Sequence, residues 1–264
     1  MMRAGTSVLP SILEAKRREI EALRRSQGRR RIEAGLEAAS PVRGFVQALK
    51  KEWAGHRIIA EMKRKSPSRG DLAREYEPGR LAEAYEAGGA VALSVLTDSG
   101  FFGGDLGHLA EARAASSLPV LRKDFILDEI QVDEARAAGA DALLLIASIL
   151  DGERLSSLKA RAEEMGMDAL VEIHDPTELR RAVEAGASLM GVNNRDLATF
   201  RVDLQVSLEL APVLPPGIVR VSESGIATRQ DLEMLSAAGY DAFLIGEALM
   251  TGGDPVGRLK GWSA

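Results

Sequence analysis

The stretch DEIQVDEARAAGADALLLI, residues 128–146, predicts the repeating unit of the fold. Its first ten residues, 128–137, have the mixed charged and apolar pattern of a surface helix. Gly139 follows, and glycine readily adopts the left-handed backbone found where helices end. Residues 142–146 form a continuous aliphatic run, as in strands of a parallel sheet that are buried on both faces. A helix that leads through a glycine into a buried strand is the basic step of an α/β protein.

This step recurs along the chain from residue 57 onward. The small-residue segment before a strand appears again as Ala87-Gly88-Gly89-Ala90, Ala185-Gly186-Ala187-Ser188 and Ala238-Gly239-Tyr240-Asp241. Eight strands are predicted, at Ile58–Met62, Ala92–Leu96, Val120–Arg122, Ala142–Ile146, Ala169–Glu172, Leu189–Val192, Ile218–Val221 and Ala242–Ile245. Helical patterns lie between them, for example at Pro78–Ala87 and Pro176–Ala185. Eight such units favour a closed (βα)8 TIM barrel over an open sheet, and no G-x-G-x-x-G follows the first strand.

The first 56 residues differ from the rest and predict a helical extension. Ser11–Arg25 is a charged amphipathic helix, and Ser40–Trp53 is again helical in pattern. The basic run at 29–31 is interpreted as a solvated helix face. We therefore expect one domain over residues 1–264, with a helical extension (1–56) over the mouth of a barrel (57–264).

Composition excludes several classes of function. The 264 residues have a net charge of −5 and 4% aromatic side chains, which argues against nucleic acid and anionic membranes as partners. There is no cysteine, so disulfides and thiolate metal sites are excluded. The first ten residues lack an apolar core, and no run of 18 apolar residues exists. We expect a cytoplasmic protein without a transmembrane helix.

Polar and ionisable groups follow seven of the eight predicted strands, at the end of a barrel where enzymes place their chemistry. Glu61, Lys63, Lys123 and Glu172 should point inward from different strands. Mixed acids and bases held close together can divide general-acid and general-base roles. The alternative is a structural layer of ion pairs, which lysine fills poorly. Asp124 and Asp196 are better explained as groups that orient neighbouring loops.

The last two strand exits predict a phosphate site. Ser224-Gly225 and Gly246-Glu247 place glycine between a strand and a helix start, where backbone N–H groups can face an anion. A tight turn would explain either glycine alone. The three histidines lack the spacing of metal ligands, and His174 should lie behind the site or at the surface, so no metal is predicted. Phe102 and Phe125 could sandwich an aromatic ring of the substrate, or could be core residues.

The motifs at these exits resemble those of the indole-3-glycerol phosphate synthase family. The resemblance is ordered along nearly the whole chain and is carried by IAEMKRKSPSRG (59–70), SVLTD (94–98), LRKDFI (121–126), LVE (170–172), GVNNRDL (191–197), SESGI (222–226) and LIGEALM (244–250). It implies a carboxy-lyase of tryptophan biosynthesis that needs no cofactor. The implied substrate is 1-(2-carboxyphenylamino)-1-deoxyribulose 5-phosphate, a phosphosugar joined to anthranilate.

The resemblance also implies roles for individual residues. Lys123 is the general acid that protonates the carbonyl oxygen, Glu172 acts in the later dehydration, and Lys63 holds the substrate carboxylate while Glu61 orients the lysines. The implied catalytic set is Glu61, Lys63, Lys123, Glu172, Asn193 and Ser224. The implied binding residues are Ser66, Phe102, Phe125 and Arg195 for the substrate, and Lys63, Ser224, Gly225, Gly246 and Glu247 for its phosphate. Glu247 departs from the family, which often has serine there.

Two alternatives remain open from the sequence. One is another phosphosugar barrel enzyme such as phosphoribosylanthranilate isomerase, and the other is a barrel that binds a phosphate ligand without catalysis. The Pro-, Ser- and Gly-rich stretch 66–70 is a candidate for a flap that closes on substrate. We expect a monomer or a weak homo-oligomer.

Overall fold

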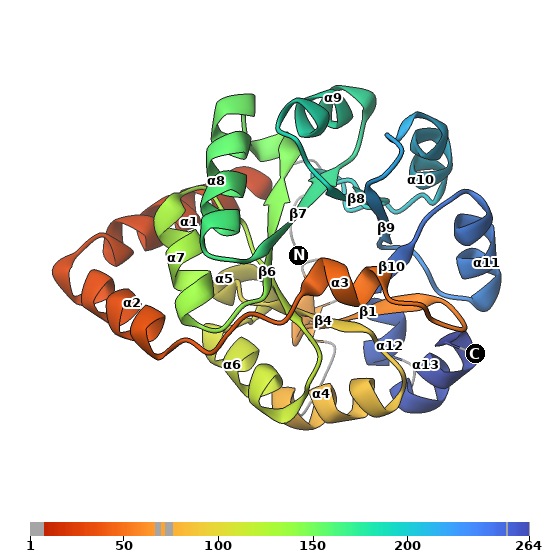
Figure 1. The fold of residues 1–264 in the computed structure, drawn as a ribbon, viewed down its shortest axis with the longest axis horizontal. Coiled ribbons are helices and arrows are strands. Elements are labelled where there is room, and N and C mark those ends of the chain that lie inside the picture. Colours follow the sequence, from red (N-terminus) through yellow and green to blue (C-terminus); the bar gives the residue numbers. More distant parts are fainter. Residues whose placement is uncertain (1–7, 67–69, 72–75, 252, 264) are drawn as a thin grey trace.

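A computed structural model describes residues 8–66, 70–71, 76–251 and 253–263. Within these residues, eight parallel strands close into a barrel in the order β1-β10-β9-β8-β7-β6-β5-β4 (Figure 1). The strands are β1 (Arg57–Met62), β4 (Ala92–Leu96), β5 (Val120–Lys123), β6 (Ala142–Ile146), β7 (Asp168–Ile173), β8 (Leu189–Asn193), β9 (Val219–Glu223) and β10 (Ala242–Ile245). The predicted fold class is confirmed, and each predicted strand is present with ends that differ by one or two residues at most.

Two further strands were not predicted. β2 (Lys65–Ser66) and β3 (Gly70–Asp71) pair antiparallel just after β1, with Lys65 opposite Asp71. They flank the stretch interpreted as a candidate flap, most of which lies outside the described residues.

Alternation along each strand divides the aliphatic residues between two cores. In β6, Leu143 and Leu145 belong to the core between strands and helices, whereas Ala142, Leu144 and Ile146 belong to the core inside the barrel. This explains why the strand sequences are mostly apolar, since both faces of each strand are covered. It also fixes which residues face the interior at every level of the barrel.

Helices surround the barrel (Figure 1). Those that follow barrel strands are α4 (Pro78–Ala87), α5 (Ser99–Phe102), α6 (Leu106–Ala115), α7 (Glu129–Ala137), α8 (Gly152–Glu164), α9 (Pro176–Glu184), α10 (Gln205–Leu210), α11 (Arg229–Ala237), α12 (Glu247–Thr251) and α13 (Pro255–Ser263), with 3-10 turns at Ala147–Ile149 and Ala211–Val213. The glycines predicted to end helices have positive φ, for example 91° at Gly139. No described helix is both long and apolar enough to span a membrane.

The N-terminal extension contacts both ends of the barrel and one side. α1 (Leu9–Leu23) covers the mouth, as predicted, and its residues Leu9 and Ile12 line the cavity there. α2 (Ser26–Ala38) packs against α7, outside the barrel. α3 (Phe45–Lys50) closes the opposite end, where it crosses in front of the strands in Figure 1. The extension is therefore more widely distributed than the sequence indicated.

The helix predicted at Ser40–Trp53 is shorter in the structure, because residues 39–44 have no helical structure. Pro41 disfavours a helical backbone at Ser40. The backbone N–H of Arg43 donates instead to Asp141 at the start of β6, with a separation of 2.6 Å. This non-helical segment leads the chain to the end of the barrel opposite the mouth, called the lower end below.

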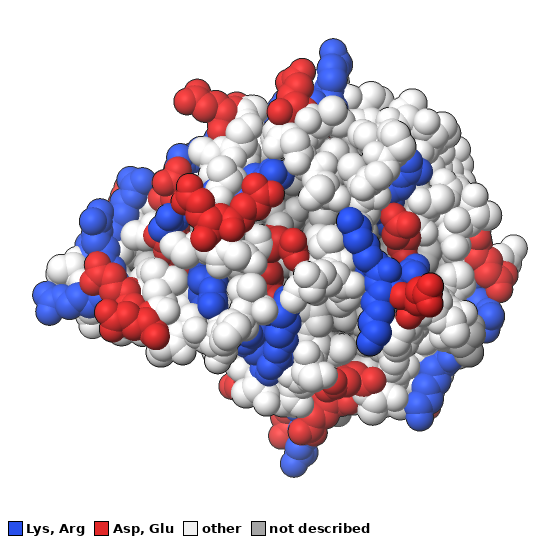
Figure 2. Space-filling model, viewed as in Figure 1, with Lys and Arg blue, Asp and Glu red and all other residues white. Residues whose placement is uncertain are grey.

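The basic run at 29–31 lies on α2, and its interpretation as a solvated face agrees with the structure. Arg29 and Arg30 are exposed, and Arg31 pairs with Glu134 of α7 at 2.9 Å. Figure 2 shows Lys and Arg interspersed with Asp and Glu around α2 on the viewed face. Mixed charge of this kind is typical of a solvated protein surface.

Asp141 joins the extension to the barrel. Its buried carboxylate accepts from the backbone N–H groups of Arg43 and Val120 and pairs with the Arg113 guanidinium. A buried carboxylate with these partners connects the extension, α6, β5 and β6 at one point.

Replacing Asp141 with alanine should lower the free energy of unfolding by about 3 kcal/mol, because Arg113 loses its buried counterion. Asp133→Ala is the control, since its pair with Arg161 is partly exposed and should contribute less than about 1 kcal/mol. Urea denaturation monitored by circular dichroism measures both values. Equal losses in the two variants would contradict this account of Asp141.

Candidate active site

The charged residues of the site come from the inward-facing rows of the barrel strands. In β1 the inward row runs from Ile59 to Glu61, and in β5 it runs from Leu121 to Lys123. The same change from aliphatic to ionisable or polar occurs in β7, β8 and β9, where the inward rows end at Glu172, Asn193 and Glu223. Each row has an aliphatic residue deeper in the barrel and a polar or ionisable residue at the mouth. The two-residue period of a strand therefore places these groups on its inward face.

Lys123 lies between two buried glutamates. Its Nζ is 3.1 Å from Oε2 of Glu172 and 2.5 Å from Oε2 of Glu223. Burial disfavours the charged amine, but Glu223 and Glu172 outweigh it and raise the pKa of Lys123. Lys123 is therefore a cation at neutral pH, held by two acceptors at the centre of the mouth.

The two glutamates are not equivalent. Burial raises the pKa of Glu223 to about 7, and the negative charge of Glu172 adds to this effect while Lys123 opposes it. Burial also acts on Glu172, but Lys123 and His174 hold its pKa below the ordinary value. Both carboxyls contact the same ammonium, so they titrate as a coupled pair.

Glu223 was not among the residues that the sequence predicted for the site. It is buried, and its Oε1 packs so closely on Gly191 of β8 that a side chain there would collide with it. The signal was present in the sequence, because Val219, Val221 and Glu223 alternate along one face of β9. Because the predicted strand ended at Val221, Glu223 was not recognised as part of this inward-facing row.

Glu61 and Lys63 form a second ion pair at the mouth, with Oε1 and Nζ 2.5 Å apart. Met62, between them, is buried on the opposite face of β1, as the alternation predicted. Burial alone would raise the pKa of Glu61, but Lys63 and Lys123 lower it below its ordinary value. Gly246 lies against the Glu61 carboxylate, and a side chain at this position would overlap it.

His174 lies behind Glu172, as predicted. Its Nε2 is 3.5 Å from Oε1 of Glu172, and its Nδ1 is 3.0 Å from Oε2 of Glu178. Burial opposes protonation, but the hydrogen bond to Glu178 and the charge of Glu172 raise the pKa of His174. Within the described residues, no group of three or more His, Asp or Glu side chains is arranged to hold a metal ion.

One part of the cavity at the mouth is apolar. Phe102 and Phe125 line it, with ring centroids 6.3 Å apart and planes inclined by 36°. Leu9 and Ile12 of α1 contribute to the same wall, together with Leu96, Leu144, Ile146, Leu197 and Phe200. The sequence predicted the two phenylalanines but not the contribution of α1, because nothing in a local pattern reveals which distant strands a helix covers.

A second part of the cavity is polar and adjoins the first. It has a volume of about 610 Å³ and is lined by the predicted phosphate residues Ser224, Gly225, Gly246 and Glu247. Glu61, Lys63, Arg195, Phe200 and Ser224 line both parts. Arg258 and Thr251 also line the polar part and were not predicted.

Ser224 and Glu247 have specific local geometry. Ser224 has a φ of 65°, which is uncommon for a residue with a side chain, and its carbonyl accepts from Asn194 Nδ2 at 3.1 Å. The Glu247 carboxylate lies 3.5 Å from Arg195, so this side chain is directed at a cation. A carboxylate that faced a phosphate would repel it, and the pairing with Arg195 offsets part of the Glu247 charge.

The structure also places the remaining residues that the sequence analysis singled out. The backbone of Ser66 lies in β2, but its side chain is outside the described residues. Asp124 and Asp196 orient loops, as predicted: Asp124 accepts from the N–H of Phe125, and Asp196 from the N–H of Thr199. The other predicted site residues all line the two-part cavity.

Comparison with known proteins gives a consistent result. The family model described as indole-3-glycerol phosphate synthase matches residues 9–260. A protein of Chlorobium phaeovibrioides with that name is 50% identical over 241 residues, which cover 91% of this chain and 93% of the relative. Indole-3-glycerol phosphate synthase 2 of Streptomyces coelicolor is 53% identical over 224 residues, which cover 85% and 86%.

Solved structures of lower identity share the fold. Thiamine phosphate pyrophosphorylase from Pyrococcus furiosus superimposes with a TM-score of 0.58 at 18% identity, covering 77% of this chain and 92% of that one. A single-residue variant of mandelate oxidase gives a TM-score of 0.61 at 17% identity, covering 81% of this chain and 74% of that one.

The pKa of Glu223 leads to a test by carboxyl-carbon NMR. One glutamate carboxyl should titrate near pH 7, and Glu223→Gln should remove this titration. The folded state keeps a proton that the unfolded state loses near pH 4.5, so this group makes the free energy of unfolding fall as pH rises to about 7. Glu163→Gln, which removes an exposed carboxyl, is the control and should leave the titration in place. A spectrum without a carboxyl that titrates above about pH 6 would contradict the assignment.

Proposed function

The chain belongs to the indole-3-glycerol phosphate synthase family, and from this we propose how its barrel mouth performs the family's reaction. The enzyme is a carboxy-lyase of tryptophan biosynthesis. The reaction closes a ring in 1-(2-carboxyphenylamino)-1-deoxyribulose 5-phosphate and releases CO₂ and water, which leaves indole-3-glycerol phosphate. The substrate has an aromatic acid at one end and a phosphate at the other.

The observation that carries the proposal is the position of Lys123 relative to the two parts of the cavity. Lys123 lines the apolar part, and the adjoining polar part extends to Gly225 and Gly246. A substrate with its ring between Phe102 and Phe125 and its phosphate at the glycines would place its carbonyl group near Lys123. Positioning of this kind is worth many orders of magnitude in rate when the reacting atoms are held in contact.

Lys123 is proposed to donate the proton to the carbonyl oxygen. Its ammonium stabilises the negative charge that develops there as the new carbon–carbon bond forms. The ring carbon that carries the carboxylate then releases CO₂, whose bonding electrons restore the aromatic ring. The pairing with Glu172 and Glu223 keeps Lys123 charged and directed into the cavity before substrate binds.

Dehydration requires a proton for the departing hydroxide and a base for the proton that is lost from the intermediate. Glu172 is proposed for this exchange, because it contacts Lys123 and is itself buried. Glu223 adds a carboxyl with a pKa of about 7, where a group can both accept and donate a proton. Asn193 lies beside them and lines the same cavity.

Lys63 is proposed to bind the substrate carboxylate, with Glu61 fixing its direction until substrate arrives. Arg195 and Ser224 line both parts of the cavity and would contact the sugar between ring and phosphate. Ser224, Gly225, Gly246 and Glu247 would hold the phosphate through backbone N–H groups, with Lys63 as a nearby cation. Ser66 is assigned to the substrate site from the family resemblance.

We further propose that the enzyme acts in the cytoplasm and binds this small-molecule substrate as a monomer or weak homo-oligomer. The absence of cysteine is compatible with a reducing compartment. The mixed surface charge around α2 is compatible with a protein that does not bind nucleic acid.

Lys123→Ala should lower kcat by roughly 100- to 10,000-fold, the range for loss of a general acid. Glu172→Gln should also lose turnover. Fluorescence of the indole product measures the rate, and captured CO₂ measures decarboxylation. Lys159→Ala, which removes a lysine paired with Glu163 on the outer helix α8, is the control and should retain full activity. Full activity in Lys123→Ala would refute the mechanism, and turnover without CO₂ would refute the reaction class.

Gly225→Ala tests the phosphate cradle. Gly225 has a φ of 82°, and an added methyl group would collide with Val202, so the backbone must shift. We expect inhibition by inorganic phosphate to weaken about tenfold, the equivalent of one lost hydrogen bond. Gly217→Ala is the matched control, because its φ of 80° imposes the same backbone strain but nothing lies within 4 Å of the added methyl. Equal phosphate inhibition in both variants would argue against the cradle.

A further inference from the structure

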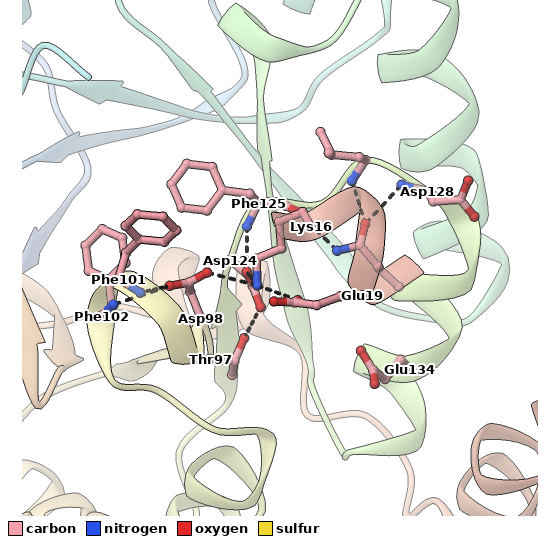
Figure 3. Close-up of polar contacts among 12 residues, drawn as sticks. Lys16, Glu19, Thr97, Asp98, Phe101, Phe102, Asp124, Phe125, Asp128 and Glu134 are labelled. Carbon is pink, nitrogen blue, oxygen red and sulfur yellow. Dashed lines mark hydrogen bonds and ion pairs between the residues drawn. The ribbon is translucent and has the colours of Figure 1, made fainter. Parts of the chain in front are cut away.

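A buried lysine outside the cavity connects α1 to the aromatic wall. Lys16 is 1% exposed, and its Nζ lies 3.0 Å from Asp98 and 2.9 Å from Asp124 (Figure 3). Glu19, one helical turn further along α1, accepts from the same amine at 2.8 Å. A buried ammonium costs several kcal/mol of desolvation unless charged partners surround it. Lys16 has three carboxylate partners, and two of them come from the barrel.

Asp98 holds the backbone of α5, the short helix that carries Phe102. Its Oδ1 accepts from the N–H of Phe101 at 2.7 Å and from the N–H of Phe102 at 3.3 Å, while its Oδ2 faces Lys16 (Figure 3). One carboxylate thus caps the helix with one oxygen and contacts the lysine with the other. The position of Asp98 sets where the Phe102 ring enters the cavity.

Asp124 likewise links Lys16 to the backbone of Phe125. Its Oδ1 accepts from the N–H of Phe125 at 2.8 Å and faces Lys16, and its Oδ2 accepts from Thr97 Oγ1 at 2.6 Å (Figure 3). Asp124 also pairs with Arg122 at 3.2 Å. This second cation holds Asp124 in place independently of Lys16.

Lys16 itself is buried and is not among the described residues that line the cavity. Leu9 and Ile12 of the same helix do line it, and Ile12 lies one turn before Lys16. Burial disfavours the charge on Lys16, but Asp124 and Asp98 raise its pKa above the ordinary value. Lys16 therefore remains a cation at neutral pH.

We propose that Lys16 is a positioning residue that fixes the distance and tilt between Phe102 and Phe125, and so sets how tightly the enzyme binds the aromatic end of its substrate. The inference rests on the proposed function for the identity of that substrate. It assigns to the N-terminal extension a role in substrate selection in addition to covering the barrel mouth.

Lys16→Met tests this proposal, because it keeps an unbranched side chain that is only one atom shorter and removes the charge. We expect KM for the carboxyphenylamino substrate to rise about tenfold while kcat changes by less than about twofold, as when binding common to ground and transition states is lost. A lysine that only stabilised the fold would instead lower the amount of active enzyme, and hence kcat, at unchanged KM. Lys16→Arg, which keeps the charge, should restore most of the KM.

Arg24→Met is the matched control. Arg24 follows α1 and pairs with Asp128 at 2.7 Å, so it also ties the extension to the barrel, but through a carboxylate that holds neither phenylalanine of the wall. We expect its KM to remain that of the wild type. A similar rise in KM in Arg24→Met would overturn the proposal, because general attachment of α1 would then explain the effect.

Hydrogen exchange in the ligand-free protein gives a measurement that does not depend on activity. In Lys16→Met the amides of Phe101 and Phe102 should exchange faster, and that of Phe125 should change less, because Asp124 retains Arg122. Uniformly faster exchange, or no change at these amides, would overturn the proposal. Wild-type protein that makes no indole product would refute the proposed function, and the exchange result would still decide the role of Lys16 in the aromatic wall.

Discussion

The burial of one ammonium between two carboxylates at the mouth of a closed barrel is the interaction on which the rest of the site depends. Lys123, Glu172 and Glu223 are largely shielded from solvent, so the ammonium and the two carboxylates require each other as charged partners. Their ion pairs link β5, β7 and β9 across the mouth of the barrel. Gly191 is needed because Glu223 occupies the space of a side chain, and Gly246 is needed because Glu61 does the same on the other side. The two glycines thus leave the space that the buried glutamates occupy.

Much of this arrangement was predictable from the sequence, because strand alternation is local. Short runs rich in apolar residues identified all eight barrel strands, and their exits identified Lys123 and Glu172. Glu223 was missed when its strand was ended two residues early. Lys16, Leu9 and Ile12 were missed for a different reason: an amphipathic helix predicts that one of its faces is buried, but not which surface buries it. The barrel partners of Lys16, Asp98 and Asp124, lie far along the chain. A pattern within one helix cannot predict contacts at such a distance in sequence.

The extension is divided according to what each segment brings to the barrel. α1 supplies apolar wall and one cation at the mouth, where a substrate ring needs a dry surface. α3 supplies Phe45 and Leu49 to the opposite end, where the inward rows are aliphatic and require a cover. Beside them, Arg43 and Val46 donate backbone N–H groups to Asp141 and Asp168 at the starts of two strands. α3 thus adds to the apolar core at the lower end, whereas α1 lines the cavity at the mouth.

The closure of the lower end by α3 has a consequence for the order of synthesis. The segment up to the end of α3 leaves the ribosome before any barrel strand, yet the N–H of Val46 bonds to Asp168, 122 positions later. Contacts of such high sequence separation form late in folding, because a long loop must close first. The segment made first therefore completes this contact only after β7 has been made, although it covers the end of the barrel opposite the mouth with Phe45.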